Sequence, residues 1–224
     1  MLQPSVKKGE CLEGICLDRP EILLNVHRAY AGAGADILST NTFGASRIKL
    51  GEFGLGSRCA EINTTAAKLA RSAAGGRAWV AGCMGPTGRL VAPLGDLTFE
   101  EAYDVFREQA AALAEGGADL LLLETFSDLK EIRAAVMAAR EHTSLPIMAS
   151  MTFGEDVITF TGTDPVTAAV VLTSLAADAV GVNCSTGPEP MLEVLGRMAT
   201  ATPLPLLVEP NAGLPRVSKR AAVY

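Results

Sequence analysis

The chain has 224 residues, of which 49% are hydrophobic, and a formal net charge of −6. This hydrophobic content is enough for a large core and excludes a mostly disordered chain. The acidic balance argues against a nucleic-acid or anionic-membrane partner, either of which would need a basic face. No apolar run approaches the roughly 20 residues that a membrane-spanning helix needs, and no signal peptide is visible at the start. We therefore expect one domain, residues 1–224, in the cytoplasm.

The cysteines and histidines limit the chemistry. Five cysteines without compact spacing fit a reducing compartment and give no disulfide framework. The two histidines, His27 and His142, fall within or at the end of predicted helices, and we interpret both as structural or surface groups. The cysteines are Cys11, Cys16, Cys59, Cys83 and Cys184.

Taken in chain order, the elements alternate between helices and apolar strands. Residues 1–17 are expected to be irregular. Helix starts are indicated by Asp18 before Pro20, by a capping box from Thr98 to Glu101, by Ser127, and by Asp164 before a proline. Helices are predicted over residues 19–32, 57–74, 98–115, 127–141, from 164 onward, and 188–199. Strands are predicted over residues 37–42, 78–84, 120–125, 146–151, from 179 onward, and 206–209.

A repeated pattern links these elements. Small residues and an aspartate end a helix, about four apolar residues follow, and polar residues then end the strand, as at 34–42, 117–125 and 177–184. Strands that are apolar throughout and alternate with helices indicate a parallel sheet covered on its faces. The predicted fold is therefore an α/β (β/α)8 TIM barrel. The six visible strands leave an open doubly wound sheet as the alternative, although no Gly-x-Gly-x-x-Gly follows the first strand.

Cys184 ends one of these strands, at the edge where parallel α/β proteins keep their active sites. The thiol is a candidate nucleophile or metal ligand, and a buried structural cysteine is the plain alternative. A nucleophile needs a base, which the two histidines do not offer, whereas zinc takes a thiolate directly but needs three or four ligands. Cys83 also ends a strand and is a weaker candidate for the same edge. The other cysteines are not expected to take part.

Glu124 ends a strand of four leucines, where a carboxylate is costly to bury without a partner. We interpret it as a group that receives a substrate ammonium, with a salt bridge to an arginine as the alternative. Asn183 precedes the candidate thiol, and Asn211 ends the following strand, 27 residues after Cys184. Either amide could bind a ligand or tie down a neighbouring loop.

Six motifs together carry a resemblance to a known family. They are Thr-Asn-Thr-Phe-Gly at 40–44, Gly-Pro-Thr-Gly at 85–88, the segment 116–126, Thr-Gly-Thr at 161–163, Gly-Val-Asn-Cys-Ser-Thr-Gly-Pro at 181–188, and Glu-Pro-Asn-Ala-Gly at 209–213. Over about residues 20–217 the chain resembles the homocysteine-binding domain of homocysteine S-methyltransferases. The likeness is strongest to the domain of cobalamin-dependent methionine synthases.

The resemblance implies a (β/α)8 barrel whose zinc ion is held by three cysteines, and Cys184 matches the first of them. Zinc lowers the pKa of the homocysteine thiol, and the resulting thiolate attacks an activated methyl group to form methionine. Glu124 matches the residue that holds the substrate amino group, and Asn211 matches one that can lie at the zinc without substrate. Asn183 and Ser185 would line the pocket. Catalytic roles are therefore expected for Cys184 and Glu124.

The chain also departs from the family pattern. The family's first strand, with an Asp-Gly pair, and its eighth strand, with two adjacent cysteines, have no counterpart, so two zinc ligands are missing. We therefore expect an incomplete barrel with edge strands near Ile37 and Leu206, and an isolated chain that is inactive by itself. The expected partners are homocysteine and a methyl donor, with methylcobalamin bound outside this domain.

Two other functions remain open on the sequence alone. One is a non-catalytic binding or assembly module derived from the same barrel. The other is an unrelated barrel lyase or aldolase, which the lack of a lysine at any strand end makes the weaker alternative.

Overall fold

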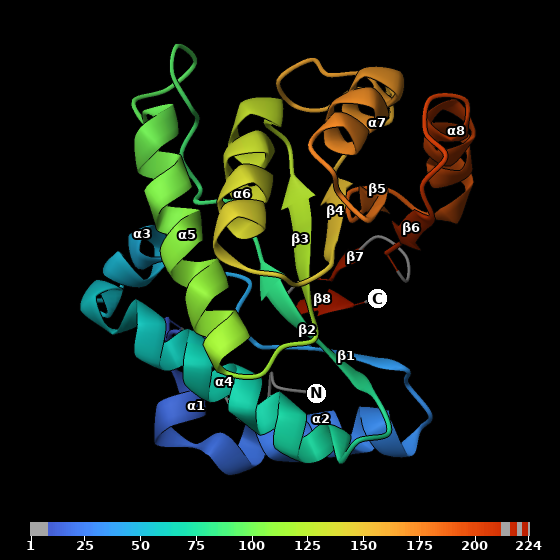
Figure 1. Cartoon of the computed structure of the whole chain (residues 1–224). Coiled ribbons are helices and arrows are strands. Elements are labelled where there is room, and N and C mark those ends of the chain that lie inside the picture. Colours follow the sequence, from blue (N-terminus) through green and yellow to red (C-terminus); the bar gives the residue numbers. More distant parts are fainter. Residues whose placement is uncertain (1–8, 212–215, 219–220, 224) are drawn as a thin grey trace.

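The computed structural model describes residues 9–211, 216–218 and 221–223. Six parallel strands form one sheet in which each strand pairs with the next one in sequence, in the order β1-β2-β3-β4-β5-β6. This arrangement is an incomplete (β/α)8 barrel and confirms the predicted fold class (Figure 1). The strands are β1 (Ile37–Ser39), β2 (Trp79–Met84), β3 (Leu120–Phe126), β4 (Ile147–Met151), β5 (Ala179–Asn183) and β6 (Leu206–Glu209).

Helices connect these strands and pack along the outer side of the sheet (Figure 1). The predicted capping box is present: the Thr98 side chain accepts a hydrogen bond from the Glu101 amide, and the Glu101 carboxylate accepts one from the Thr98 amide. The helices are α1 (Ile15–Asp18), α2 (Pro20–Gly32), α3 (Arg47–Gly51), the 3-10 helix η2 (Gly56–Arg58), α4 (Cys59–Ala74), α5 (Phe99–Glu115), α6 (Leu129–His142), α7 (Pro165–Ser174) and α8 (Pro188–Ala199).

Several predicted boundaries were wrong. The cap of α6 is Asp128, whose carboxylate accepts from the Lys130 amide at 2.8 Å, and Ser127 lies one residue before it. Strand β1 ends at Ser39 because residues 40–42 turn away to form the loop to α3. The short helices α1 and α3 were missed, since four or five residues are too few to show helical periodicity. An antiparallel pair, β7 (Arg216–Ser218) and β8 (Ala221–Val223), was also not predicted.

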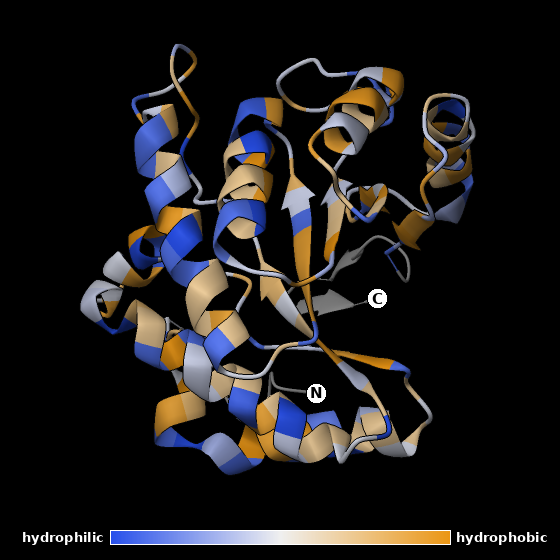
Figure 2. Cartoon of the chain, in the orientation of Figure 1, coloured by the Kyte–Doolittle hydropathy of each residue, from blue (hydrophilic) through white to orange (hydrophobic). Residues whose placement is uncertain are grey.

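The main core lies between the outer face of the sheet and helices α5, α6, α7 and α8. Leu121 and Leu123 on β3 are fully buried in it, and the rings of Phe106 and Phe126 pack with their centroids 5.7 Å apart. Figure 2 shows largely hydrophobic strands and helices that alternate between hydrophobic and hydrophilic residues. Since side chains alternate across a strand, Leu122 and Glu124 point to the opposite, inner face of the sheet.

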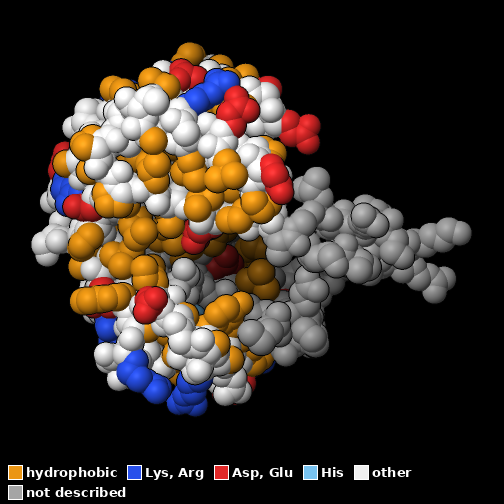
Figure 3. Space-filling model, turned by 90° about the vertical axis from the view of Figure 1, so that its right-hand side faces the viewer, with side chains coloured by type: hydrophobic (Ala, Val, Ile, Leu, Met, Phe, Trp, Pro, Cys, Tyr) orange, Lys and Arg blue, Asp and Glu red, His pale blue; other side chains and the backbone are white. Residues whose placement is uncertain are grey.

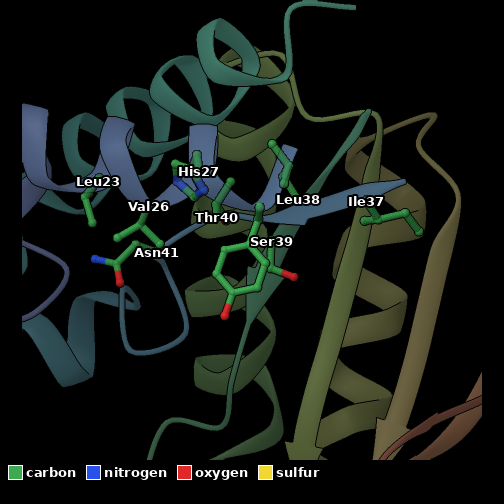
Figure 4. Close-up of a pocket in the computed structure, with 9 residues that line it drawn as sticks. Leu23, Val26, His27, Ile37, Leu38, Ser39, Thr40 and Asn41 are labelled. Carbon is green, nitrogen blue, oxygen red and sulfur yellow. The ribbon is translucent and has the colours of Figure 1, made fainter. Parts of the chain in front are cut away.

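The edge strands are β1 and β6, as predicted. Ile37 on β1 is 42% exposed and Val208 on β6 is 43% exposed, so both edges carry apolar side chains open to solvent. A cavity of about 300 Å³ lies along β1, where side chains of α2 face those of the strand (Figure 4). His27 lines this cavity, is 7% exposed, and has no hydrogen-bond partner for Nε2 among the described residues. Burial lowers its pKa, so the ring is a neutral, structural group.

A buried carboxylate ties the loop after β2 to α6. Glu131 on α6 is 3% exposed, and its Oε1 accepts hydrogen bonds from the amide and the hydroxyl of Thr87, at 2.7 and 2.6 Å. Burial raises the pKa of Glu131, although the bonds from Thr87 oppose that effect. The folded protein therefore holds this proton more tightly than the unfolded chain does.

The raised pKa of Glu131 predicts how the free energy of unfolding changes with pH. A raised pKa adds stability that is complete below the unfolded pKa of about 4.3 and is lost as pH rises through the folded value. Glu131→Gln keeps an acceptor for Thr87 but cannot ionise. In urea unfolding between about pH 4.5 and 7.5, we expect this variant to gain stability relative to the parent as pH rises. A difference that stays constant with pH would contradict this explanation, and Glu115→Gln, an exposed change at the end of α5, is the control.

Candidate functional site

A cavity of about 530 Å³ opens at the carboxyl ends of β1, β2, β3 and β5. In Figure 3 hydrophobic side chains surround a hollow on this side of the molecule, and acidic side chains lie in and around it. Parallel strands bring their carboxyl ends to one edge, so residues far apart in sequence meet there. The lining residues are Ser39, Thr40, Asn41, Thr42, Phe43, Cys83, Glu124, Thr125 and Cys184.

Strand β3 is irregular at its end, directly after Glu124. The pairing of β3 with β4 shifts register between Leu123 and Phe126, and Thr125 has a φ of 67°. A non-glycine residue in this left-handed region costs about 1–3 kcal/mol, and such strain clusters at functional sites. The bulge thus separates Glu124, which faces the cavity, from Phe126, which returns to the core.

The Glu124 carboxylate accepts hydrogen bonds from two side chains. Its Oε1 accepts from the Cys83 thiol at 2.8 Å, and its Oε2 accepts from Nδ2 of Asn183 at 3.3 Å. Among the residues that the structure describes, no lysine, arginine or histidine forms an ion pair with it. The alternative of a salt bridge to arginine is therefore wrong for this part of the chain.

Asn183 connects three strand ends. Its side chain is 1% exposed, and Oδ1 accepts from the Thr125 amide at 2.8 Å and from the Ser150 hydroxyl at 2.9 Å. Nδ2 donates to Oγ1 of Thr125 at 2.7 Å as well as to Glu124. The amide therefore holds β3 in its bulged form and is both a structural tie and a neighbour of the candidate binding group.

Cys184 follows β5 and lies half-buried at the cavity. Its φ is 58° and that of Ser185 is 63°, so two successive non-glycine residues adopt the left-handed conformation at the strand end. The thiol lies 3.7 Å from Oγ1 of Thr125 and 3.5 Å from Nδ2 of Asn183. The structure thus brings Glu124, Asn183 and Cys184 together.

Ser185 and Asn211 are placed differently. Ser185 is exposed and lines a separate cavity of about 370 Å³, next to Thr152 and Phe160 rather than Glu124. Asn211 is half-buried, and its backbone amide donates to the Thr186 carbonyl at 3.3 Å, which ties it to the loop after β5. Both lie near the site, but neither side chain is among those that line the cavity of Glu124.

Two side chains at or near the site, the thiol of Cys83 and the carboxylate of Glu209, have a larger part than the sequence suggests. Cys83 is the weaker candidate by sequence, yet its thiol lines the cavity and contacts Glu124. Glu209, at the end of β6, enters the sequence argument only as part of a motif. Partial burial raises the pKa of Glu209, and the negative charge of Glu124 raises it further. A signal for Glu209 exists in the sequence, since like Glu124 it is a carboxylate that ends an apolar strand.

The other three cysteines lie away from the cavity. Cys11, Cys16 and Cys59 belong to a buried cluster under α2 and α4. Burial raises the pKa of Cys11, and it raises the pKa of Cys16 and of Cys59 to about 12, so these thiols stay protonated at neutral pH.

Two kinds of feature are absent from the described part of the chain. Residues 9–211 contain no group of three His, Cys, Asp or Glu side chains arranged to hold a metal ion. None of the helices described is long and apolar enough to span a bilayer.

Comparison with known proteins shows what the chain resembles. The family model described as homocysteine S-methyltransferase matches residues 1–224. The methionine synthases of Mycobacterium tuberculosis (strain ATCC 25618 / H37Rv) and Mycobacterium leprae (strain TN) are each 32% identical to it over 225 residues, which cover 96% of this chain and 19% of those proteins. The crystal structure of the homocysteine methyltransferase MmuM from Escherichia coli, in its metallated form, superposes with a TM-score of 0.83 at 25% identity, covering 94% of this chain and 80% of that one.

Proposed function

The chain belongs to the homocysteine S-methyltransferase family, and from this we propose that its cavity binds homocysteine and presents the thiol for methylation to methionine. The chain spans 19% of the length of the methionine synthases that it matches, so the activity of a whole protein of that kind is part of the proposal. In the reaction an S–CH3 bond forms while the bond from the methyl group to its donor breaks, and the thiol loses its proton.

One observation supports this proposal most strongly. Glu124 is a carboxylate at the cavity with two hydrogen-bond donors and no protein cation among the described residues. A partly buried negative charge of this kind is stabilised by a cation, and an amino-acid substrate brings one in its ammonium group. The charge of Glu209, which interacts with that of Glu124, adds to the negative potential. Glu124 is therefore proposed to bind the substrate amino group.

Cys184, a half-buried thiol that lines the same cavity, is the second group of the proposed site. We propose it as a zinc ligand, with zinc supplying the Lewis acid that ionises the substrate thiol when bound. Zinc needs three or four protein ligands, and the described residues offer no set of three. They therefore do not form a zinc site by themselves, and a zinc ion at Cys184 would need ligands from outside them.

The roles of the remaining polar residues follow from their positions. Asn183 is proposed to hold Glu124 and Thr125 in place for the substrate. Ser185 and Asn211 are proposed to contact ligand from the rim, since their backbones belong to loops beside Cys184. Phe43 gives the cavity an apolar wall suited to the methylene groups of the substrate.

The methyl donor is proposed to be bound by a different part of a longer protein. Support comes from the methionine synthase relatives, in which the matching region is 19% of the length and most of the protein lies outside it. Methylcobalamin is the proposed donor.

A non-catalytic binding or assembly module remains the second candidate, because the described residues lack a complete metal site. This candidate differs from the first in what the purified chain binds.

Calorimetry with the purified chain distinguishes the two. We expect homocysteine to bind about 10- to 150-fold more tightly than 4-mercaptobutanoate, which has the same thiol and carboxylate but no amine, because a hydrogen bond to a charged group contributes about 1.5–3 kcal/mol. Equal binding of the two ligands, or binding of neither, would sink the proposed function and favour the module. The zinc ligand is tested in a longer protein that contains this chain, where loss of zinc in Cys184→Ser, measured by metal analysis, would identify Cys184 as a ligand.

A further inference from the structure

The buried thiol of Cys83 is held against the carboxylate that is proposed to bind substrate. Cys83 lies on β2 and pairs in register with Leu122 on β3. Because alternate residues of a strand share a face, Glu124, two residues after Leu122, lies on the same inner face. The Cys83 thiol reaches across this strand pair and donates to Oε1 of Glu124 at 2.8 Å.

Hydrogen bonds hold both backbone polar groups of Cys83, its amide and its carbonyl. Its amide donates to Oγ1 of Thr40 at 2.9 Å, and its carbonyl accepts from Oγ1 of Thr42 at 2.6 Å. Both threonines belong to the segment that follows β1, and their hydroxyls also lie 2.5 Å apart. The segment after β1 thus holds in place the backbone from which the thiol extends.

The state of the thiol follows from its surroundings. Cys83 is 3% exposed, and burial raises its pKa well above the usual range, with the charge of Glu124 raising it further. A thiol in this setting stays protonated at neutral pH. It therefore acts as a donor to the carboxylate.

The two donors to Glu124 come from opposite sides. Cys83 on β2 binds Oε1, and Asn183 on β5 binds Oε2. A carboxylate has about four acceptor positions, so each oxygen keeps capacity for a further donor. Held by both, the carboxylate loses little rotational freedom when a ligand ammonium arrives, which is the physical basis of preorganisation.

We propose that Cys83 is a positioning residue for substrate binding: its thiol fixes the Glu124 carboxylate in the orientation that receives the ammonium group of an amino-acid substrate. The inference rests on the proposed function. A buried cysteine then contributes to substrate recognition without acting as a nucleophile or a metal ligand.

The test compares Cys83→Ala with Cys83→Ser in the full chain. Calorimetry is run with homocysteine and with 4-mercaptobutanoate, which lacks the amine. The alanine variant loses the donor, and we expect homocysteine to bind about 3- to 10-fold more weakly, the range of one net hydrogen bond, while binding of 4-mercaptobutanoate stays unchanged. The serine variant keeps an O–H donor, and we expect its preference for the amine to stay within about twofold of the parent.

The ratio of the two affinities separates positioning from simple packing. A variant that only loosens the fold weakens both ligands equally, and that result would overturn the inference. An alanine variant that binds homocysteine as tightly as the parent would also overturn it. If the parent itself shows no preference for homocysteine, the proposed function fails together with the inference, whereas a preference that is undiminished in Cys83→Ala refutes the inference alone. Thermal unfolding of both variants identifies any loss of fold.

Discussion

Replacing Glu124 by glutamine is expected to reduce homocysteine affinity by about 10- to 150-fold, because the variant loses the charge proposed to bind the ammonium group and a charge-assisted hydrogen bond is worth about 1.5–3 kcal/mol. The change is nearly isosteric. The amide oxygen can still accept from Cys83 or Asn183, so the fold around β3 is expected to persist. Calorimetry on the purified chain measures the effect, and the preference for homocysteine over 4-mercaptobutanoate should disappear.

Glu209→Gln is the matched control for this prediction. Glu209 interacts with Glu124 by charge and also ends an apolar strand, but it is more exposed. Its removal is expected to weaken homocysteine binding by only about twofold, since an exposed charge is strongly screened. Equal effects of the two variants would show that the cavity attracts the ammonium by overall charge rather than by contact with Glu124.

Gly181→Ala is expected to have the largest effect on folding. Gly181 lies on β5 and pairs with Leu207 on β6, and a Cβ atom at this position would meet the Leu207 carbonyl oxygen at 2.0 Å and the Leu207 Cβ at 2.8 Å. Such overlap with backbone cannot be relieved by turning a side chain. Strand β6 would have to move away from β5, and we expect a loss of about 3 kcal/mol or more of the free energy of unfolding.

The consequence reaches the candidate site, because Asn183 and Cys184 lie two and three residues further along. Urea unfolding measures the stability of the variant, and a loss below about 1 kcal/mol would mean that β5 and β6 are not packed as described. Gly196→Ala is the control. Gly196 is inside α8, and a Cβ atom added there would have no atom of the described residues within 4 Å, so alanine is expected to stabilise the helix by about 0.5–1 kcal/mol.

Local signals explain why the strands and most helices were predictable. The four leucines at 120–123, bounded by turn and polar residues, are typical of a buried strand, and Thr98 with Glu101 forms a cap from residues three apart. The alternation of these elements restricts the fold to a parallel sheet with helices on its outer side. The N-terminus of α6 was missed by one residue, because Ser127 and Asp128 are both good caps and only the loop geometry chooses between them.

The site was partly predictable for the same reason. Polar residues that end apolar strands are visible in sequence, and in a parallel sheet they must share one edge, which gave Glu124, Asn183 and Cys184. Orientation was not predictable. Ser185 follows Cys184 directly but lines another cavity, because two successive left-handed residues turn the chain there.

The order of the elements, the parallel sheet and the strand ends that carry polar groups follow from the sequence, because they depend on periodicity and on neighbours in the chain. Which of these groups meet depends on how the strands pair in three dimensions. The bulge at Thr125 leaves that residue at the cavity and returns Phe126 to the core, and the register of β2 with β3 brings the Cys83 thiol to the Glu124 carboxylate. Residues 83 and 124 are 41 positions apart, and their contact arises from strand pairing, which no local pattern encodes.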